Sequence, residues 1–185
     1  LQQALKHRLE GLDADSLAVL QWAAVLGPLL EFHHLQAVCS LPDRVLYEIC
    51  AGLSQRRLLC ETQDFQMASL GTTEVVLDSM PWRGRRERHA HVAAYLEGLP
   101  RPSQQDIGYE WDIGYHWSQA GEPEKSGRAF LAAAQHAIRS YAFDEACRCL
   151  DQIEQILDEH MNQGGKNFKL ITGLLTVSLL RQRFG

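Results

Sequence analysis

The stretch GYHWSQAGEPEKSGRAFLAAAQHAIRSYAFDEACRCLDQIEQIL, residues 114–157, decides the fold of this chain. Its apolar and alanine residues recur at intervals of three and four, which is the spacing of one face of an α-helix. Only short connections separate the successive helical patterns, so neighbouring helices are expected to run antiparallel. The pattern and its surroundings predict four helices, over residues 107–119, 123–140, 143–159 and 166–183.

The small and aromatic residues of the same stretch follow the tetratricopeptide pattern. Five of them fall at its small, aromatic, small, aromatic and alanine positions: Gly114, Trp117, Ser126, Phe130 and Ala133. Ala146, Leu150 and Ile153 repeat the second half of the pattern, and Ala146 follows Ser126 by 20 residues where a regular repeat has 34. We therefore expect a degenerate repeat in which one helix serves two units.

The first hundred residues predict a different arrangement of helices and strands. Apolar residues at helical spacing indicate short helices over residues 1–9, 13–27, 31–41 and 42–53. Asp13, Asp15 or Ser16 can cap the second of them, Gly27 and Pro28 end it, and Pro42 stands at the start of the fourth.

Two strand candidates follow these helices, residues 58–60 and 65–67, with a polar turn between them. Three helices followed by a hairpin is the order of a winged helix. Two further helices, within residues 72–80 and 83–99, precede the linker PRPSQQD at 100–106. The expected fold is mainly α, with a winged-helix-like domain over residues 1–99 and a tetratricopeptide-like helical array over residues 100–185.

Composition excludes several classes of protein. The chain is 45% apolar and carries 18 Lys and Arg against 23 Asp and Glu, a net charge of −5, so no overall positive field recruits nucleic acid. The five cysteines are odd in number and mostly lie in apolar patterns, which favours reduced thiols and a cytoplasmic location. Neither a signal peptide nor an apolar run of about 20 residues occurs, so no membrane association is expected.

The two ends of the chain suggest a segment of a longer protein. It begins at Leu1 rather than Met and ends in the apolar helical pattern of residues 166–183. Because helical arrays bury each unit against the next, an apolar terminal helix predicts either a missing repeat or self-association. We expect Leu175 to lie in that self-association surface.

Taken in order along the chain, four segments resemble a known family. They are RLEGLDADSLAVLQWAAVLG at 8–27, FQMASLGTTEVVLDSM at 65–80, RRERHAHVAAYLE at 85–97 and residues 114–157. Over about residues 8–158 the chain is similar to the region that follows the ATPase core in STAND-type (AAA/NACHT-like) multidomain signalling ATPases. The resemblance implies a winged helix, tetratricopeptide-like helices and ATP binding by a separate upstream domain. It also implies a regulatory and interaction role.

Candidate sites for metal binding or catalysis lack their minimum parts. His33 and His34 are neighbours, so helical geometry turns them about 100° apart and one metal cannot hold both without help. His89 and His91 are two residues apart within a predicted helix, and with His116 we expect them to pack or cap. Cys147 and Cys149 have the same spacing and the same expected role.

Catalytic motifs are absent from the sequence. There is no CxxC pair, no HExxH and no activated-serine elbow. QGGKNF at 163–168 contains Gly-Lys, but His160 stands where a phosphate loop needs its first glycine. We therefore expect no catalytic residue, no metal and no cofactor in this segment.

Two groups remain as candidates for interaction. The basic cluster comprises Arg83, Arg85, Arg86 and Arg88, which can grip phosphate or, as we favour, form a solvated helix start and salt bridges. Trp111 and Trp117 are spaced as core residues of a helical hairpin, with a groove-lining role as the alternative.

These observations predict a non-catalytic regulatory and protein-interaction segment of a larger signalling ATPase or transcriptional regulator. Its partners are expected to be other proteins or adjacent domains of the same chain. The alternative is a DNA-binding winged-helix transcription factor with a helical oligomerisation domain. Such a reader helix needs phosphate and base contacts, but residues 43–57 carry only three arginines against Asp43 and Glu48.

Overall fold

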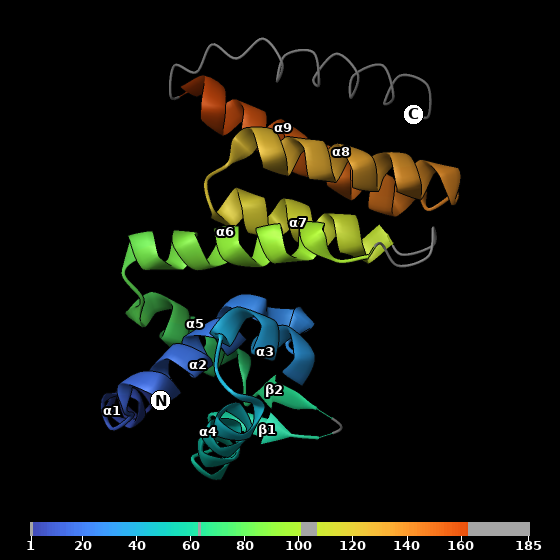
Figure 1. Ribbon diagram of the computed structural model, residues 1–185. Coiled ribbons are helices and arrows are strands. Elements are labelled where there is room, and N and C mark those ends of the chain that lie inside the picture. The colour runs from blue at the N-terminus through green and yellow to red at the C-terminus, as the bar shows by residue number, and fades with distance from the viewer. Residues whose placement is uncertain (1, 63, 101–106, 163–185) are drawn as a thin grey trace. The chain divides into compact units, whose positions relative to one another are not determined.

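The computed structural model describes residues 2–62, 64–100 and 107–162 (Figure 1). This described part of the chain is mainly helical, with nine α-helices and one two-stranded sheet, and confirms the expected mainly α class. It divides into two compact units between Tyr95 and Leu96. The domain limits 1–99 and 100–185 stay a prediction. The linker at 101–106, the helix expected at 166–183 and Leu175 lie outside the described residues.

The first unit contains six helices, a 3-10 turn and the hairpin. In chain order these are α1 Gln2–Glu10, α2 Ala14–Leu26, η1 Gly27–Leu29, α3 Phe32–Cys39, α4 Asp43–Gln55, β1 Leu59–Glu61, β2 Phe65–Met67, α5 Leu70–Ser79 and most of α6 Trp82–Gly98. The expected helices and strands all form within a few residues of their predicted limits. Among the described residues, no helix is both long and apolar enough to cross a bilayer.

Helix α2 lies at the centre of the first unit. It contacts α3, α4, α5 and β2, and its residues from Ala23 to Leu26 are all buried. The Asp13 carboxylate accepts a 2.8 Å hydrogen bond from the amide of Ser16, which caps the first turn. Gly27, at a φ of 56°, ends the helix. It is also the first residue of η1, and Pro28 follows as the second. Of the three expected capping residues, Asp13 is the N-cap.

The hairpin is tied to α3 by one carboxylate. Strands β1 and β2 pair antiparallel, with Cys60 opposite Gln66. Oδ1 of Asp64 accepts a hydrogen bond from the amide of Phe65 at 2.7 Å and another from the amide of Phe32 at 2.9 Å. Phe32 is the first residue of α3, whose N-cap Glu31 makes no side-chain capping bond. A residue 32 positions later in the chain therefore satisfies an amide at the start of α3.

The described part of the second unit is formed by three helices and the end of α6. Helix α7 spans Ile107–Gln119, α8 Pro123–Arg139 and α9 Phe143–Asn162. Helix α8 packs on both of the others, as Figure 1 shows within this unit. The α8–α9 core contains Phe130, Ala133, Ala134, Cys149, Leu150, Ile153, Ile156 and Leu157. Alternating alanines with larger residues lets the helices approach closely while filling the space between them.

Close contact between α7 and α8 depends on Gly114. A Cβ atom at this position would lie 2.8 Å from the nearest atom of the Phe130 ring, closer than carbon atoms pack. Next to this contact, the buried hydroxyl of Ser126 donates a 2.8 Å hydrogen bond to the Gly114 carbonyl. These two interactions fix how α8 lies along α7.

The turns after α7 and α8 share one hydrogen-bonding pattern but differ in their key residue. After α7, Gly121 has a φ of 72°, and the amides of Gly121 and Glu122 bond to Ser118 and Trp117. After α8, Tyr141 takes the equivalent place at a φ of 60°, and the amides of residues 141 and 142 bond to residues 138 and 137. Both are Schellman motifs, in which glycine is the favoured residue.

This pair of turns predicts opposite effects of two exchanges. Tyr141→Gly should raise the free energy of unfolding by about 1 kcal/mol, because a left-handed backbone conformation is costly for a residue with a Cβ atom. The Tyr141 side chain is 81% exposed, so little packing is lost. Gly121→Tyr should lower the same quantity by at least about 1 kcal/mol. Urea unfolding of both variants measures this, and equal stability of the Tyr141→Gly and unaltered chains would contradict it.

Candidate functional site

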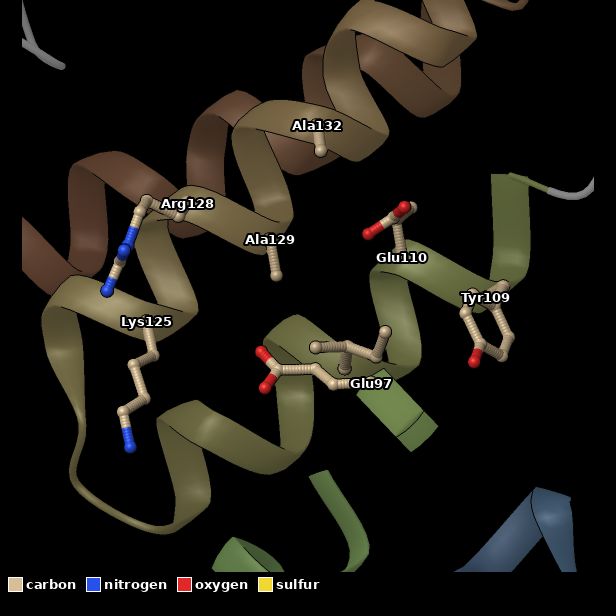
Figure 2. A pocket seen from close by; sticks show the side chains of 8 residues that line it. Glu97, Tyr109, Glu110, Lys125, Arg128, Ala129 and Ala132 are labelled. Atoms are coloured by element: carbon tan, nitrogen blue, oxygen red, sulfur yellow. The ribbon is translucent and has the colours of Figure 1, made fainter. Parts of the chain in front are cut away.

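The second unit contains a pocket of about 410 Å³ lined by α6, α7 and α8, which we call the mixed-charge pocket. Its lining residues are Glu97, Tyr109, Glu110, Ile113, Lys125, Arg128, Ala129 and Ala132 (Figure 2). Those of α8 follow one another at intervals of three, one and three, so they share one face of that helix. The alanines leave space between the longer charged side chains.

Charges of both signs line this pocket, and they are separated in space. Figure 2 shows Lys125 and Arg128 at one end, Tyr109 and Glu110 at the other, and Glu97 between them. Acidic groups of a bound ligand would therefore contact the cations at one end of the pocket. Its basic groups would contact the carboxylates along the rest of the pocket. The pocket suits a ligand whose own charges alternate in sign.

Contacts with Trp117 hold two of the pocket's charges in place. The buried indole donates a hydrogen bond from its Nε1 to Oε1 of Glu97 at 2.8 Å. Nζ of Lys125 lies 3.9 Å from the centre of the same ring, a cation–π contact. A buried aromatic residue thus fixes one acidic and one basic group at the pocket's edge.

Two further hydrogen bonds anchor the ends of the pocket. The Tyr109 hydroxyl donates to the carbonyl of Leu96, which ties α7 to the last turn of α6. Arg128 donates from Nε to the carbonyl of Glu124 at 3.3 Å, leaving the rest of its guanidinium group for other acceptors. The lining groups include carboxylates, cations, a phenol and alanines, which can form ion pairs, hydrogen bonds and apolar contacts with a ligand.

Most arginines of the basic cluster have intramolecular contacts in the described structure. Arg83 pairs with Glu87 at 2.9 Å on the exposed side of α6. Arg86 lies over the Trp82 ring at 4.7 Å, and Arg88 is half-buried over the Trp22 ring at 5.1 Å. Burial lowers the pKa of Arg88. Three of the four arginines thus have intramolecular contacts, and Arg85 is partly exposed on the same helix.

Trp111 and Trp117 both have roles in packing. Trp111 packs against Phe130 with ring centroids 5.0 Å apart, beside the α8–α9 core. Trp117 is buried and contacts Glu97 and Lys125, two lining residues of the mixed-charge pocket. Trp117 itself does not line the pocket. It contributes to the pocket indirectly, by holding Glu97 and Lys125 in place.

The histidines fall in different surroundings. His89 is buried in the first unit and His116 in the second, and His91 is exposed with its ring 5.3 Å from that of Trp22. Burial lowers the pKa of His116 to about 4, which keeps its imidazole neutral at pH 7. His33 and His34 were expected to point about 100° apart, but their rings lie side by side, with centroids only 3.9 Å apart.

In comparisons with protein-family models, curated proteins and solved structures, no match to the chain was found. Function is therefore inferred from the residues of this chain.

Sequence reasoning missed most of the mixed-charge pocket. Lys125 and Arg128 precede core residues of α8 and look like ordinary exposed positions of an amphipathic helix. The available signal was Ala129 and Ala132, small residues on the same face as these two cations. Glu97 carried no signal, because its contact with Trp117 joins residues 20 positions apart.

Burial predicts which cysteines react with alkylating reagents. It raises the pKa of Cys39 and Cys50 to about 12 and that of Cys149 to about 11, so these thiols remain protonated at pH 8. Cys60 and Cys147 are exposed. We expect iodoacetamide at pH 8 to modify these two first and the other three only after unfolding. Mass spectrometry of digested protein checks this, and early modification of Cys50 would contradict it.

Proposed function

We propose that this chain is a non-catalytic regulatory and protein-interaction segment of a larger cytoplasmic signalling ATPase. In this proposal the first unit is winged-helix-like and the second is a tetratricopeptide-like helical array. The segment couples a nucleotide-driven switch in a separate domain, which binds the ATP, to a protein partner or an output module.

The order of elements supports this assignment. Helices α2, α3 and α4 are followed directly by the β1–β2 hairpin, the order of a winged helix. In the second unit, the Phe130 ring packs against the backbone at Gly114, and the Ser126 hydroxyl donates a hydrogen bond to the Gly114 carbonyl. These are small and aromatic positions of the tetratricopeptide pattern, and here they mediate helix–helix contact.

The mixed-charge pocket is the observation that carries the interaction role. Its fixed carboxylate and ammonium groups offer paired contacts to a polypeptide that bears side chains of both signs. We propose a partner segment with an acidic residue for Lys125 and Arg128 and a basic residue for Glu97 and Glu110. Contacts of this kind weaken as salt rises, because exposed charges are screened over about 8 Å at physiological ionic strength.

Peptide selection tests this proposal directly. Twelve-residue peptides selected from a random display library against the chain should carry both acidic and basic residues. Their affinity should fall at least about tenfold in the Lys125→Glu, Arg128→Glu chain, because paired charges become like charges. Fluorescence anisotropy of synthetic peptides measures the affinities.

The matched control is the Arg139→Glu, Arg148→Glu chain. It has the same change of net charge, and its substitutions lie outside the pocket lining. The selected peptides should bind this control as they bind the unaltered chain. An equal loss in both double variants would indicate attraction by overall charge alone and would overturn the proposed site.

The DNA-binding alternative predicts a different result with duplex probes. In α4, the candidate reader helix, Arg44 pairs with Glu48 at 2.9 Å, which offsets the positive charge needed at phosphates. We therefore expect binding to a labelled duplex no tighter than about 10⁻⁶ M at physiological salt, the range of non-specific association. Anisotropy with one duplex and scrambled competitors checks this. Preference for one sequence would favour the transcription-factor alternative.

A further inference from the structure

Three potential metal ligands meet at the start of α3, in the first unit. They are Glu31, His33 and His34, and one ligand atom from each lies within 4.8 Å of the others. Nδ1 of His33 lies 3.2 Å from Oε2 of Glu31, and the two imidazole rings have centroids 3.9 Å apart. Among the described residues, no other set of three or more histidines, cysteines or carboxylates has its ligand atoms this close together.

Local backbone structure explains why neighbouring histidines converge. Glu31 stands before α3 in an extended conformation and its side chain makes no capping bond, so the carboxylate lies against His33 instead. His33 and His34 lie in the first turn, where no preceding turn of helix restricts their rotamers. The expected divergence of about 100° applies to Cβ directions, and at this helix start the rings depart from it.

Tyr95 holds one of the rings. Its hydroxyl lies 3.0 Å from Nδ1 of His34, at hydrogen-bonding distance. Metal-binding imidazoles usually have their second ring nitrogen held in this way, which fixes the ring's orientation. With Nδ1 of His34 held by Tyr95, we assign Nε2 of the same ring to the metal. Tyr95 is a positioning residue in this arrangement.

We propose that Glu31, His33 and His34 bind a divalent transition-metal ion such as Zn²⁺, with water completing the coordination. Two imidazoles and a carboxylate suit zinc, nickel or copper better than magnesium or calcium, which prefer oxygen ligands. Two ligand atoms on a tetrahedral zinc lie about 3.3 Å apart, close to the 3.2 Å between His33 and Glu31.

Access and charge also fit this site. The side chains of His33 and Glu31 are 61% and 56% exposed, so an ion reaches them without opening the core. The Glu31 carboxylate offsets the partial positive charge at the start of α3, which by itself disfavours a cation. A bound ion would tie residue 31 to the first turn of α3 and stabilise the joint between η1 and α3.

Calorimetric titration of the full chain with zinc chloride tests the proposal. We expect one site per chain, and an affinity at least about tenfold lower in His33→Ala and in Glu31→Gln. Tyr95→Phe should weaken binding by about tenfold, as loss of a partner of a metal-binding histidine does. The matched control is His7→Ala, since His7 is another exposed histidine beside a carboxylate, with Nδ1 3.5 Å from Glu10. This control should bind zinc like the unaltered chain.

Two further measurements separate this site from other ligands on the surface. Thiols are common zinc ligands and Cys60 and Cys147 are exposed, so the titration is repeated with the Cys60→Ser, Cys147→Ser chain, where the affinity should be retained. Ring-nitrogen NMR signals of His33 and His34 should shift with zinc and stay in place with magnesium. Zinc binding that survives both His33→Ala and Glu31→Gln, or that disappears with the thiols, would overturn the proposal. Circular dichroism confirms that each variant is folded.

Discussion

The second unit depends on the contact between the ring of Phe130 and the backbone of α7 at Gly114. Since any side chain at 114 would collide with that ring, the two helices approach more closely here than a Cβ atom permits. The Ser126 hydroxyl adds a directional bond to the same backbone segment. Contact and bond together set the register of α8 along α7. The mixed-charge pocket is a consequence of that register, because it places Ala129 and Ala132 in the same lining as Ile113 and Glu110.

A comparable constraint in the first unit comes from the Asp64 carboxylate. The carboxylate accepts hydrogen bonds from the amides of Phe32 and Phe65, and it thereby joins the start of α3 to the hairpin. Glu31 occupies the N-cap position beside this bond, but its side chain makes no capping bond. Its carboxylate lies against His33 instead, with Oε2 3.2 Å from Nδ1. The residues proposed to bind a metal therefore lie next to the contact that joins α3 to the hairpin.

Sequence predicted those features that depend on neighbouring residues. Helical periodicity located all the described helices, Asp13 and Gly27 marked the ends of α2, and the strands were expected within one residue of their positions. Prediction from the sequence failed at contacts between residues that are far apart along the chain. Asp64 acts on a helix start 32 residues earlier, Trp117 holds Glu97 across 20 residues, and His34 contacts Tyr95 across 61. Such contacts depend on how helices pack, which local patterns do not encode. The winged-helix and tetratricopeptide assignments remain proposals.

The two proposed sites depend on different interactions, which bears on the regulatory role that we propose. The mixed-charge pocket presents both signs of charge, so it attracts no ligand by net field and selects by the pattern of charges instead. Its contacts are exposed and therefore respond to ionic strength. Coordination by Glu31, His33 and His34 depends instead on ligand chemistry and on the supply of the ion, because lone pairs bond directly to the metal. The pocket and the proposed metal ligands lie in different units and share no residue, so a substitution in one set removes no side chain of the other.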